Sequence, residues 1–119
     1  LKNVCLNFNC TYKLKYDLYC PSSINDVSLS ERVEKISEKI IGKQNITEFH
    51  PIMGGEDFAF FSIKVPSCYI FVGIGKECGI NHSNKFTINE DILPYTTFYL
   101  SSLLLQLLKD LQSEKKRRK

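Results

Sequence analysis

The stretch Ser67-Cys68-Tyr69-Ile70-Phe71-Val72-Gly73 (SCYIFVG) decides which fold the sequence predicts. Five apolar residues follow one another between Pro66 on one side and the glycines Gly73 and Gly75 on the other. An uninterrupted apolar run of this length is typical of a strand that is buried on both faces, as in parallel sheets. The stretch therefore predicts an α/β domain built around a buried strand.

Helical segments are predicted before this strand. Residues 28–41 repeat apolar side chains with a period near 3.6, begin with a capping box formed by Ser28 and Glu31, and end at Gly42. The apolar stripe consists of Leu29, Val33, Ile36 and Ile40. Residues 57–65 predict a second, short helix that ends before the next proline.

A third helix is predicted after the strand. Thr87 and Glu90 form a second capping box, and residues 92–111 are apolar around most of the helix circumference, so we expect this helix to be buried. A membrane span is the alternative, but residues 92–108 are only just long enough and include a proline and several hydroxyl side chains. The order of elements predicts half of a layered α/β domain with helices on both sheet faces.

The first part of the chain has a different period. Apolar and polar residues alternate from Val4 to Tyr16, which predicts a long strand with one solvated face in an antiparallel sheet. A cluster of turn-forming residues follows at 21–26, and the period changes there. We expect the end of a lid-like α+β module in residues 1–20, the α/β core in residues 21–112 and a basic tail in residues 113–119.

Composition limits the chain to one modest core. It has 119 residues, begins at Leu1 without a secretory signal pattern, and is expected to be a piece of a longer protein. The net charge is +3, and the last six residues hold five cations and one acid; this tail is either solvated or contacts phosphates or lipid headgroups. Five cysteines without a C-x-x-C pair favour reduced thiols and a cytoplasmic location.

A glycine-rich loop after the buried strand contains the candidate metal ligand His82. Ligands bind beyond the carboxyl ends of strands in α/β sheets, and imidazole is the commonest protein ligand for zinc. One histidine makes no metal site, because zinc needs at least two further protein donors. The alternative for His82 is a polar loop or capping residue. For His50, the second histidine, a solvated loop position is expected.

The segment Gly54-Gly55-Glu56-Asp57 is the second candidate. Two glycines are retained most readily where φ is positive or where another group approaches the backbone closely. Glu56 and Asp57 could act as an acid and a base if their environments separate their pKa values. The alternative is an acidic first turn that offsets the dipole of the following helix.

Several linked motifs resemble one known family in order and spacing, over about residues 25 to 108. They are Met53-Gly54-Gly55-Glu56-Asp57-Phe58, Val65-Pro66, Val72-Gly73-Ile74-Gly75, His82-Ser83-x-x-Phe86 and Asn89-Glu90-Asp91-x-Leu93-Pro94. The chain resembles the C-terminal part of the dinuclear zinc-type metallopeptidase and amidohydrolase superfamily. Within it, the chain looks like the N-acyl-amino-acid amidohydrolases, which include aminoacylases, hippurate hydrolases and auxin-conjugate hydrolases.

The resemblance implies a three-layer catalytic domain, preceded here by the last strand of a lid and dimerisation domain, in a homodimeric enzyme. It implies two divalent metals (Zn, Mn or Co), with His82 as a ligand of one and with Gly54, Gly55, Glu56 and Asp57 beside the site. The implied reaction is hydrolysis of N-acyl amino acids or related peptides by a metal-activated water. No nucleic acid or membrane partner is implied.

Two features separate this chain from an active family member. The family's other ligands and its general-base glutamate lie upstream of residue 1, so we expect this segment alone to be inactive. Asn84 replaces the usual proline of the histidine motif, and Asn81 stands where the family has an apolar residue or a second loop segment. We therefore expect a shorter loop and an altered presentation of His82. The alternative is a non-catalytic binding or assembly module derived from the same family.

Overall fold

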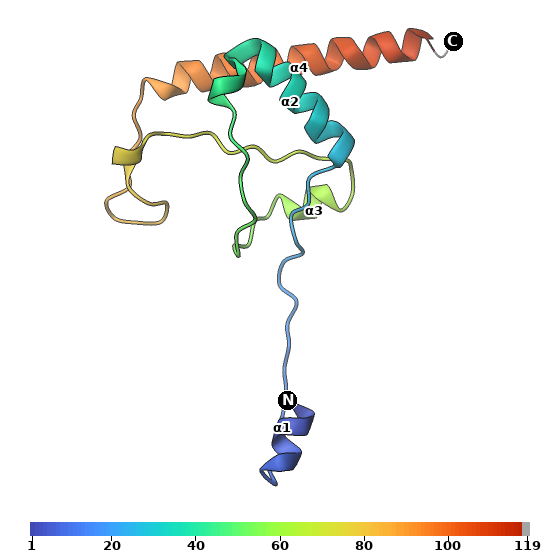
Figure 1. Cartoon of the computed structure of the whole chain (residues 1–119), viewed down its shortest axis with the longest axis vertical. Helices are drawn as coiled ribbons and strands as arrows, with labels where there is room; N and C mark the ends of the chain where they lie inside the picture. Colours follow the sequence, from blue (N-terminus) through green and yellow to red (C-terminus); the bar gives the residue numbers. More distant parts are fainter. Residues whose placement is uncertain (118–119) are drawn as a thin grey trace.

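Two helices, α2 (Val27–Ile41) and α4 (Ile92–Arg117), pack against each other at one end of the computed structural model, which describes residues 1–117 (Figure 1). Their contact buries one apolar cluster. The cluster consists of Val33 and Ile36 from α2 and Tyr99 and Leu103 from α4, with Leu29, Ile40, Ile41, Cys68, Ile70 and Leu107 packed around it. The helical stripe predicted for residues 28–41 is therefore confirmed as the face that is buried.

Helix α2 begins one residue earlier than predicted, and its cap is different. Asp26, not Ser28, is the N-cap: its carboxylate accepts hydrogen bonds from the Leu29 amide at 2.8 Å and from the Ser28 hydroxyl at 2.8 Å. A carboxylate at this position satisfies an orphan amide and opposes the positive helix end. The C-terminal stop is confirmed, because Gly42 has a φ of 81° and donates to the Glu38 carbonyl.

Helix α4 extends the predicted segment of residues 92–111 as far as Arg117. The expectation that this helix is buried was wrong within the described residues, since only Tyr99 and Leu103 are buried and several of its leucines are exposed. The predicted capping box does not form: the Thr87 amide donates to the Cys78 carbonyl instead. Within the described residues no helix is both long and apolar enough for a membrane span.

Polar contacts also join α2 and α4. The Tyr99 and Ser37 hydroxyls lie 2.7 Å apart in the buried interface, and Ser37 also donates to the Val33 carbonyl. Arg32 forms an ion pair with Glu114 at 2.7 Å. Residue 114 belongs to the predicted basic tail, which is thus helical as far as residue 117; residues 118 and 119 lie outside the described part.

Neither predicted strand forms in residues 1–117, where the structure contains helices and irregular segments. Residues Lys2–Asn7 of the first predicted strand form a short helix, α1, and residues 67–73 of the second have no strand partner. A strand needs a neighbour for its backbone N–H and C=O groups. The described residues supply none, so the alternating pattern yields a local helix and extended chain instead.

The remaining elements are short. Helix α3 (Ala59–Ser62) confirms the helix predicted within residues 57–65, although it has only 4 residues. Single 3₁₀ turns occur at η1 (Lys43–Asn45) and at η2 (Lys76–Cys78). These elements lie on the irregular segments that connect α2 to α4 (Figure 1).

The chain leaves much of its apolar surface in solvent. Its accessible surface is 11038 Å², whereas a closed monomer of this mass exposes about 6,600 Å². The radius of gyration is 20.9 Å, against about 13.5 Å for a compact domain of this length. Helix α1 and the following segment point away from the helix pair (Figure 1). The described residues therefore do not enclose a complete core.

Candidate functional site

Glu56 is the residue of the acidic segment whose side chain is fixed by hydrogen bonds. Its carboxylate accepts hydrogen bonds from the Tyr69 hydroxyl at 3.1 Å and from the Phe58 amide at 3.2 Å, one on each oxygen. The Cys20 thiol donates to the Glu56 carbonyl at 3.4 Å. The hydrogen bond to Glu56 raises the pKa of Tyr69, because ionising the phenol removes the donor and sets two negative charges together.

Tyr69 is in turn held by the segment that precedes α2. The Asn25 carboxamide donates to the Tyr69 carbonyl at 3.1 Å and accepts from the Tyr69 amide at 2.7 Å. The neighbouring Asp26 amide donates to the Ser67 carbonyl at 2.8 Å. Asn25 thus pairs with the backbone of residue 69 as a neighbouring strand would, and it fixes the start of α2 to the segment of residues 67–69.

Aromatic rings surround the Tyr69 side chain. The ring centroid of Tyr69 lies 5.1 Å from that of Phe58 and 5.1 Å from that of Phe71, with an edge-on arrangement to Phe71. Phe49 stacks on Phe71 with centroids 4.2 Å apart. Aromatic pairs at these distances attract one another, so the packing restricts the orientation of the Tyr69 ring.

The two glycines before Glu56 have no steric explanation within the described chain. A Cβ at Gly55 would meet no atom within 4 Å, and one at Gly54 would meet only the Ile52 side chain at 3.8 Å. Neither has a positive φ, and Asp57 is exposed. The role of Gly54, Gly55 and Asp57 beside a site stays a prediction.

His82 lies exposed near the tip of a closed loop. The Thr87 amide donates to the carbonyl of the buried Cys78 at 2.9 Å, which closes the loop at its base. At Gly79, with a φ of 71°, a Cβ would approach the Lys85 carbonyl oxygen to 2.7 Å. His82 itself has a φ of 64°, a left-handed conformation that side-chain-bearing residues adopt infrequently.

The structure does not bring the two candidate segments together. The loop of residues 78–87 and the turn of residues 53–57 lie on separate parts of the chain (Figure 1). No three His, Cys, Asp or Glu side chains among residues 1–117 are grouped so that they could hold a metal ion. His82 is therefore a single donor here, and the described residues do not fit a complete metal centre. His50 is exposed, as expected.

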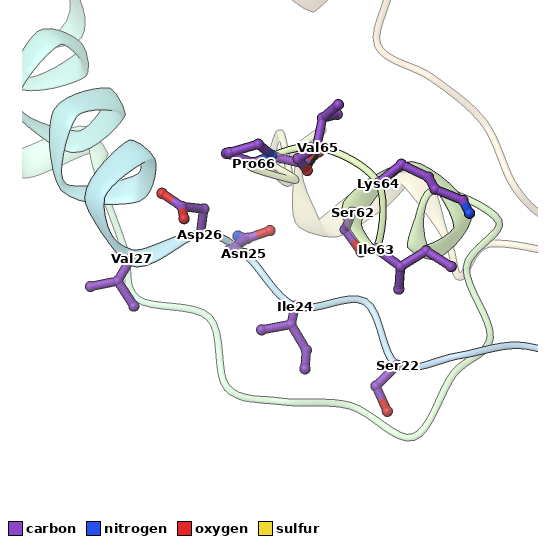
Figure 2. A pocket seen from close by; sticks show the side chains of 11 residues that line it. Ser22, Ile24, Asn25, Asp26, Val27, Ser62, Ile63, Lys64, Val65 and Pro66 are labelled. Atoms are coloured by element: carbon purple, nitrogen blue, oxygen red, sulfur yellow. Dashed lines mark hydrogen bonds between the residues drawn. The ribbon is translucent and has the colours of Figure 1, made fainter.

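An open cavity of about 520 Å³ lies beside the start of α2 (Figure 2). Residues 22–27, without Ser23, line one side and residues 62–67 line the other. The Asp26 amide donates to the Ser67 carbonyl, so one hydrogen bond joins the two sides. The cavity contains none of the predicted site residues, so it is a crevice between two segments rather than the predicted site.

The sequence pattern predicts neither the hydrogen bond of Tyr69 to Glu56 nor the pairing of Asn25 with the Tyr69 backbone. The sequence pattern indicates a turn residue at Asn25 and an apolar strand residue at Tyr69. The two are 44 positions apart, and no local spacing rule connects them. The one available signal was the hydroxyl of Tyr69 within an otherwise apolar run, since a buried tyrosine usually requires a hydrogen-bond partner.

Comparison with known proteins agrees with the motifs. Peptidase family M20/M25/M40 matches residues 4–106. The IAA-amino acid hydrolase ILR1-like 2 of Arabidopsis thaliana is 31% identical over 97 residues, covering 79% of this chain and 22% of the relative. The thermostable carboxypeptidase 1 of Saccharolobus solfataricus is 33% identical over 99 residues, covering 78% of this chain and 24% of the relative.

A third relative, the putative amidohydrolase YhaA of Bacillus subtilis, is 28% identical over 94 residues, covering 76% of this chain and 24% of the relative. No solved structure matches. The chain spans about a quarter or less of the length of these relatives. The match extends over most of the chain and confirms the resemblance that the motifs indicated: the chain belongs to peptidase family M20/M25/M40.

Proposed function

We propose that this chain supplies the C-terminal part of a metal-dependent amidohydrolase that cleaves N-acyl amino acids or related peptides. The family match over residues 4–106 carries the proposal. The names of the relatives support the substrate class, since one is a hydrolase of IAA-amino acids, one a carboxypeptidase and one a putative amidohydrolase. All three names denote hydrolases, and two of them name a bond to an amino acid or a peptide.

The metal-binding side chains present in this chain indicate which part of the metal site it would provide. His82 would provide one ligand of a site with two divalent ions (Zn, Mn or Co), and the remaining ligands would come from outside these residues. The chain holds no group of three metal-binding side chains in residues 1–117. Since a zinc site needs three or four protein donors, the chain alone would bind metal weakly and catalyse nothing.

The same proposal covers the fold and the assembly. Residues 21–112 would complete a zinc-peptidase-like α/β domain, in which residues 67–73 pair with strands from outside these residues. Residues 1–20 would end a lid and dimerisation domain of a cytoplasmic homodimer, and residues 113–119 would be the basic tail. The exposed apolar surface of the chain supports this, because it must be covered in a folded protein.

The test is hydrolysis of a panel of N-acetyl amino acids and dipeptides by the complete product of the gene that encodes this chain, supplied with Zn²⁺, Mn²⁺ or Co²⁺. We expect activity from the complete product and none from residues 1–119 alone. His82→Ala should abolish activity. His50→Ala is the matched control, since it removes the other exposed histidine, and it should leave activity unchanged.

A non-catalytic assembly module is the second candidate, and the exposed apolar residues of α4 favour it. These residues include Leu93, Leu100, Leu104, Leu105, Leu108 and Leu111. A complete gene product that forms a stable complex but hydrolyses none of the panel with any of the three metals would select this alternative over the enzyme.

A further inference from the structure

We propose that Tyr69 is a positioning residue of the proposed hydrolase site, which holds the Glu56 carboxylate in one orientation. The inference rests on the proposed function, because it gives Glu56 a role beside the reacting groups. It adds a residue that belongs to none of the family motifs found in the sequence. The observation that carries it is a continuous set of hydrogen bonds from Asn25 through Tyr69 to Glu56.

Both ends of Tyr69 are fixed. Its backbone N–H and C=O both pair with the Asn25 carboxamide, at 2.7 Å and 3.1 Å. Its ring lies between Phe58 and Phe71, with centroids 5.1 Å from each. Because both the backbone and the ring of Tyr69 are restrained, its hydroxyl has a nearly fixed position. Little conformational entropy is therefore lost when this hydroxyl donates to Glu56.

The Glu56 carboxylate is restrained without being neutralised. The Tyr69 hydroxyl bonds to Oε2 and the Phe58 amide bonds to Oε1, so rotation of the carboxylate would break both bonds. No lysine, arginine or histidine of residues 1–117 forms a salt bridge with Glu56. Each oxygen keeps an acceptor position, which is free to accept a hydrogen bond from a further group of the proposed site.

Tyr69 therefore acts on Glu56 and not on the substrate itself. The Phe58 amide alone would fix only one oxygen, and the carboxylate could then turn about that contact. Loss of a group that bonds directly to a metal ligand reduces activity about 10- to 100-fold. Tyr69 bonds to a residue beside the site rather than to a ligand, so its loss is expected at the low end of that range. Tyr69→Phe is the suitable change, because it removes the hydroxyl and keeps the ring between its two aromatic neighbours.

The experiment measures kcat and KM of the complete gene product with the N-acetyl amino acid it hydrolyses best. The variants are Tyr69→Phe, Glu56→Gln and the double substitution, with Tyr95→Phe as matched control on an exposed tyrosine of α4. We expect kcat/KM to fall about 10-fold in Tyr69→Phe. The double variant should have the same kcat/KM as Glu56→Gln, because both substitutions act on the same Tyr69–Glu56 hydrogen bond.

A spectroscopic measurement separates positioning from a loss of stability. In protein labelled with ¹³Cζ-tyrosine, the resonance that Tyr69→Phe removes should titrate above the ordinary pKa of 10.0, and Glu56→Gln should move its midpoint down toward that value. Melting temperatures of all variants should lie well above the assay temperature. Tyr95→Phe should change neither the kinetics nor this resonance.

The outcomes distinguish this inference from the proposed function. An active wild type whose Tyr69→Phe variant is equally active, or whose two defects multiply in the double variant, contradicts the positioning role and leaves the hydrolase proposal standing. A Tyr69 resonance that ignores Glu56→Gln also contradicts it. A wild type that hydrolyses nothing in the panel contradicts the proposed function, and the positioning role falls with it.

Discussion

The α2–α4 pair and the two segments predicted as strands had equally clear sequence patterns, yet only the helices formed. Each helix finds its partner within the chain: the stripe of α2 packs on Tyr99 and Leu103 of α4. A helix also satisfies its own backbone hydrogen bonds. The segments of residues 4–16 and 67–73 need a neighbouring strand, and residues 1–117 do not offer one.

The comparison shows what a periodic pattern specifies. A periodic pattern indicates which face of a segment is apolar and is buried in the folded protein. A strand forms only where a second strand completes its backbone hydrogen bonds. Residues 67–73 show this directly, since the Asn25 side chain takes the place of a strand at residue 69 alone. The α2–α4 pair should therefore respond to substitution through contacts within the described residues, and its response can be compared with that of the loops and helix ends.

The largest effect is expected from Leu103→Ala in the helix pair. Leu103 is 5% exposed, and truncating a buried leucine lowers the free energy of unfolding by about 2–5 kcal/mol. Hydrogen exchange of the α2 and α4 amides in the complete gene product measures it. Lys109→Ala, at an exposed charged position of the same helix, is the control and should leave the exchange rates nearly unchanged. An equal loss in both variants would contradict the buried position of Leu103.

The next effect is expected from Gly79→Ala in the His82 loop. A Cβ there would lie 2.7 Å from the Lys85 carbonyl oxygen at a φ of 71°. A backbone with a φ of 71° and a ψ of −178° is essentially restricted to glycine, and a residue held there with a side chain costs about 1–3 kcal/mol. Gly55→Ala, whose Cβ would meet no atom within 4 Å, is the matched control. Limited proteolysis of the loop should accelerate for Gly79→Ala only; equal rates for both variants would contradict the loop conformation.

A smaller and pH-dependent effect is expected at the start of α2. Hydrogen bonds from the Leu29 amide and then the Ser28 side chain lower the pKa of Asp26 from its ordinary value of 3.8. The charged cap therefore stabilises the fold above that value, and the contribution disappears as the pH falls through the lowered pKa. Unfolding midpoints measured from neutral to acidic pH should show this loss in the wild type.

Asp26→Asn is the control for this measurement, because asparagine still caps the helix and does not titrate in this range. Its midpoint should depend less on pH than that of the wild type. A parallel pH dependence in both proteins would mean that the Asp26 carboxylate does not make the cap hydrogen bond in solution.

The smallest effect is expected from the ion pair that joins α2 to the end of α4. Arg32 and Glu114 lie 2.7 Å apart, but their side chains are 34% and 44% exposed. Partly exposed pairs contribute about 0–1 kcal/mol. Glu114→Gln should therefore lower the unfolding free energy by less than about 1 kcal/mol, and 0.5 M salt should remove the difference. A salt-independent loss would contradict an ion-pair origin.

The helices were predictable because their signals are local. The stripe of residues 28–41, the stop at Gly42 and the core of the last helix follow from side chains 3 or 4 positions apart, and they appear within a residue of the predicted start for α2 and α4. The cap was assigned to Ser28 rather than Asp26 because both residue types serve as caps. The burial of α4 was overestimated because composition does not show whether a partner is present.

The candidate site was predictable only in its parts. The glycine-rich loop and the acidic turn were found from residue types and motifs, and the structure places His82 and Glu56 in such segments. The contacts that hold Glu56 come from residues 20, 58 and 69, and two of these are far away in the sequence. Hydrogen bonds at such separations leave no periodic signal.

The most direct test of the account is the metal content of the complete gene product, measured by elemental analysis after equilibration with Zn²⁺. The account predicts two ions per subunit in the wild type and in His50→Ala, and fewer than two in His82→Ala. A His82→Ala protein that is folded and retains two tightly bound ions would contradict the claim that this chain completes a metal centre whose other donors lie outside it.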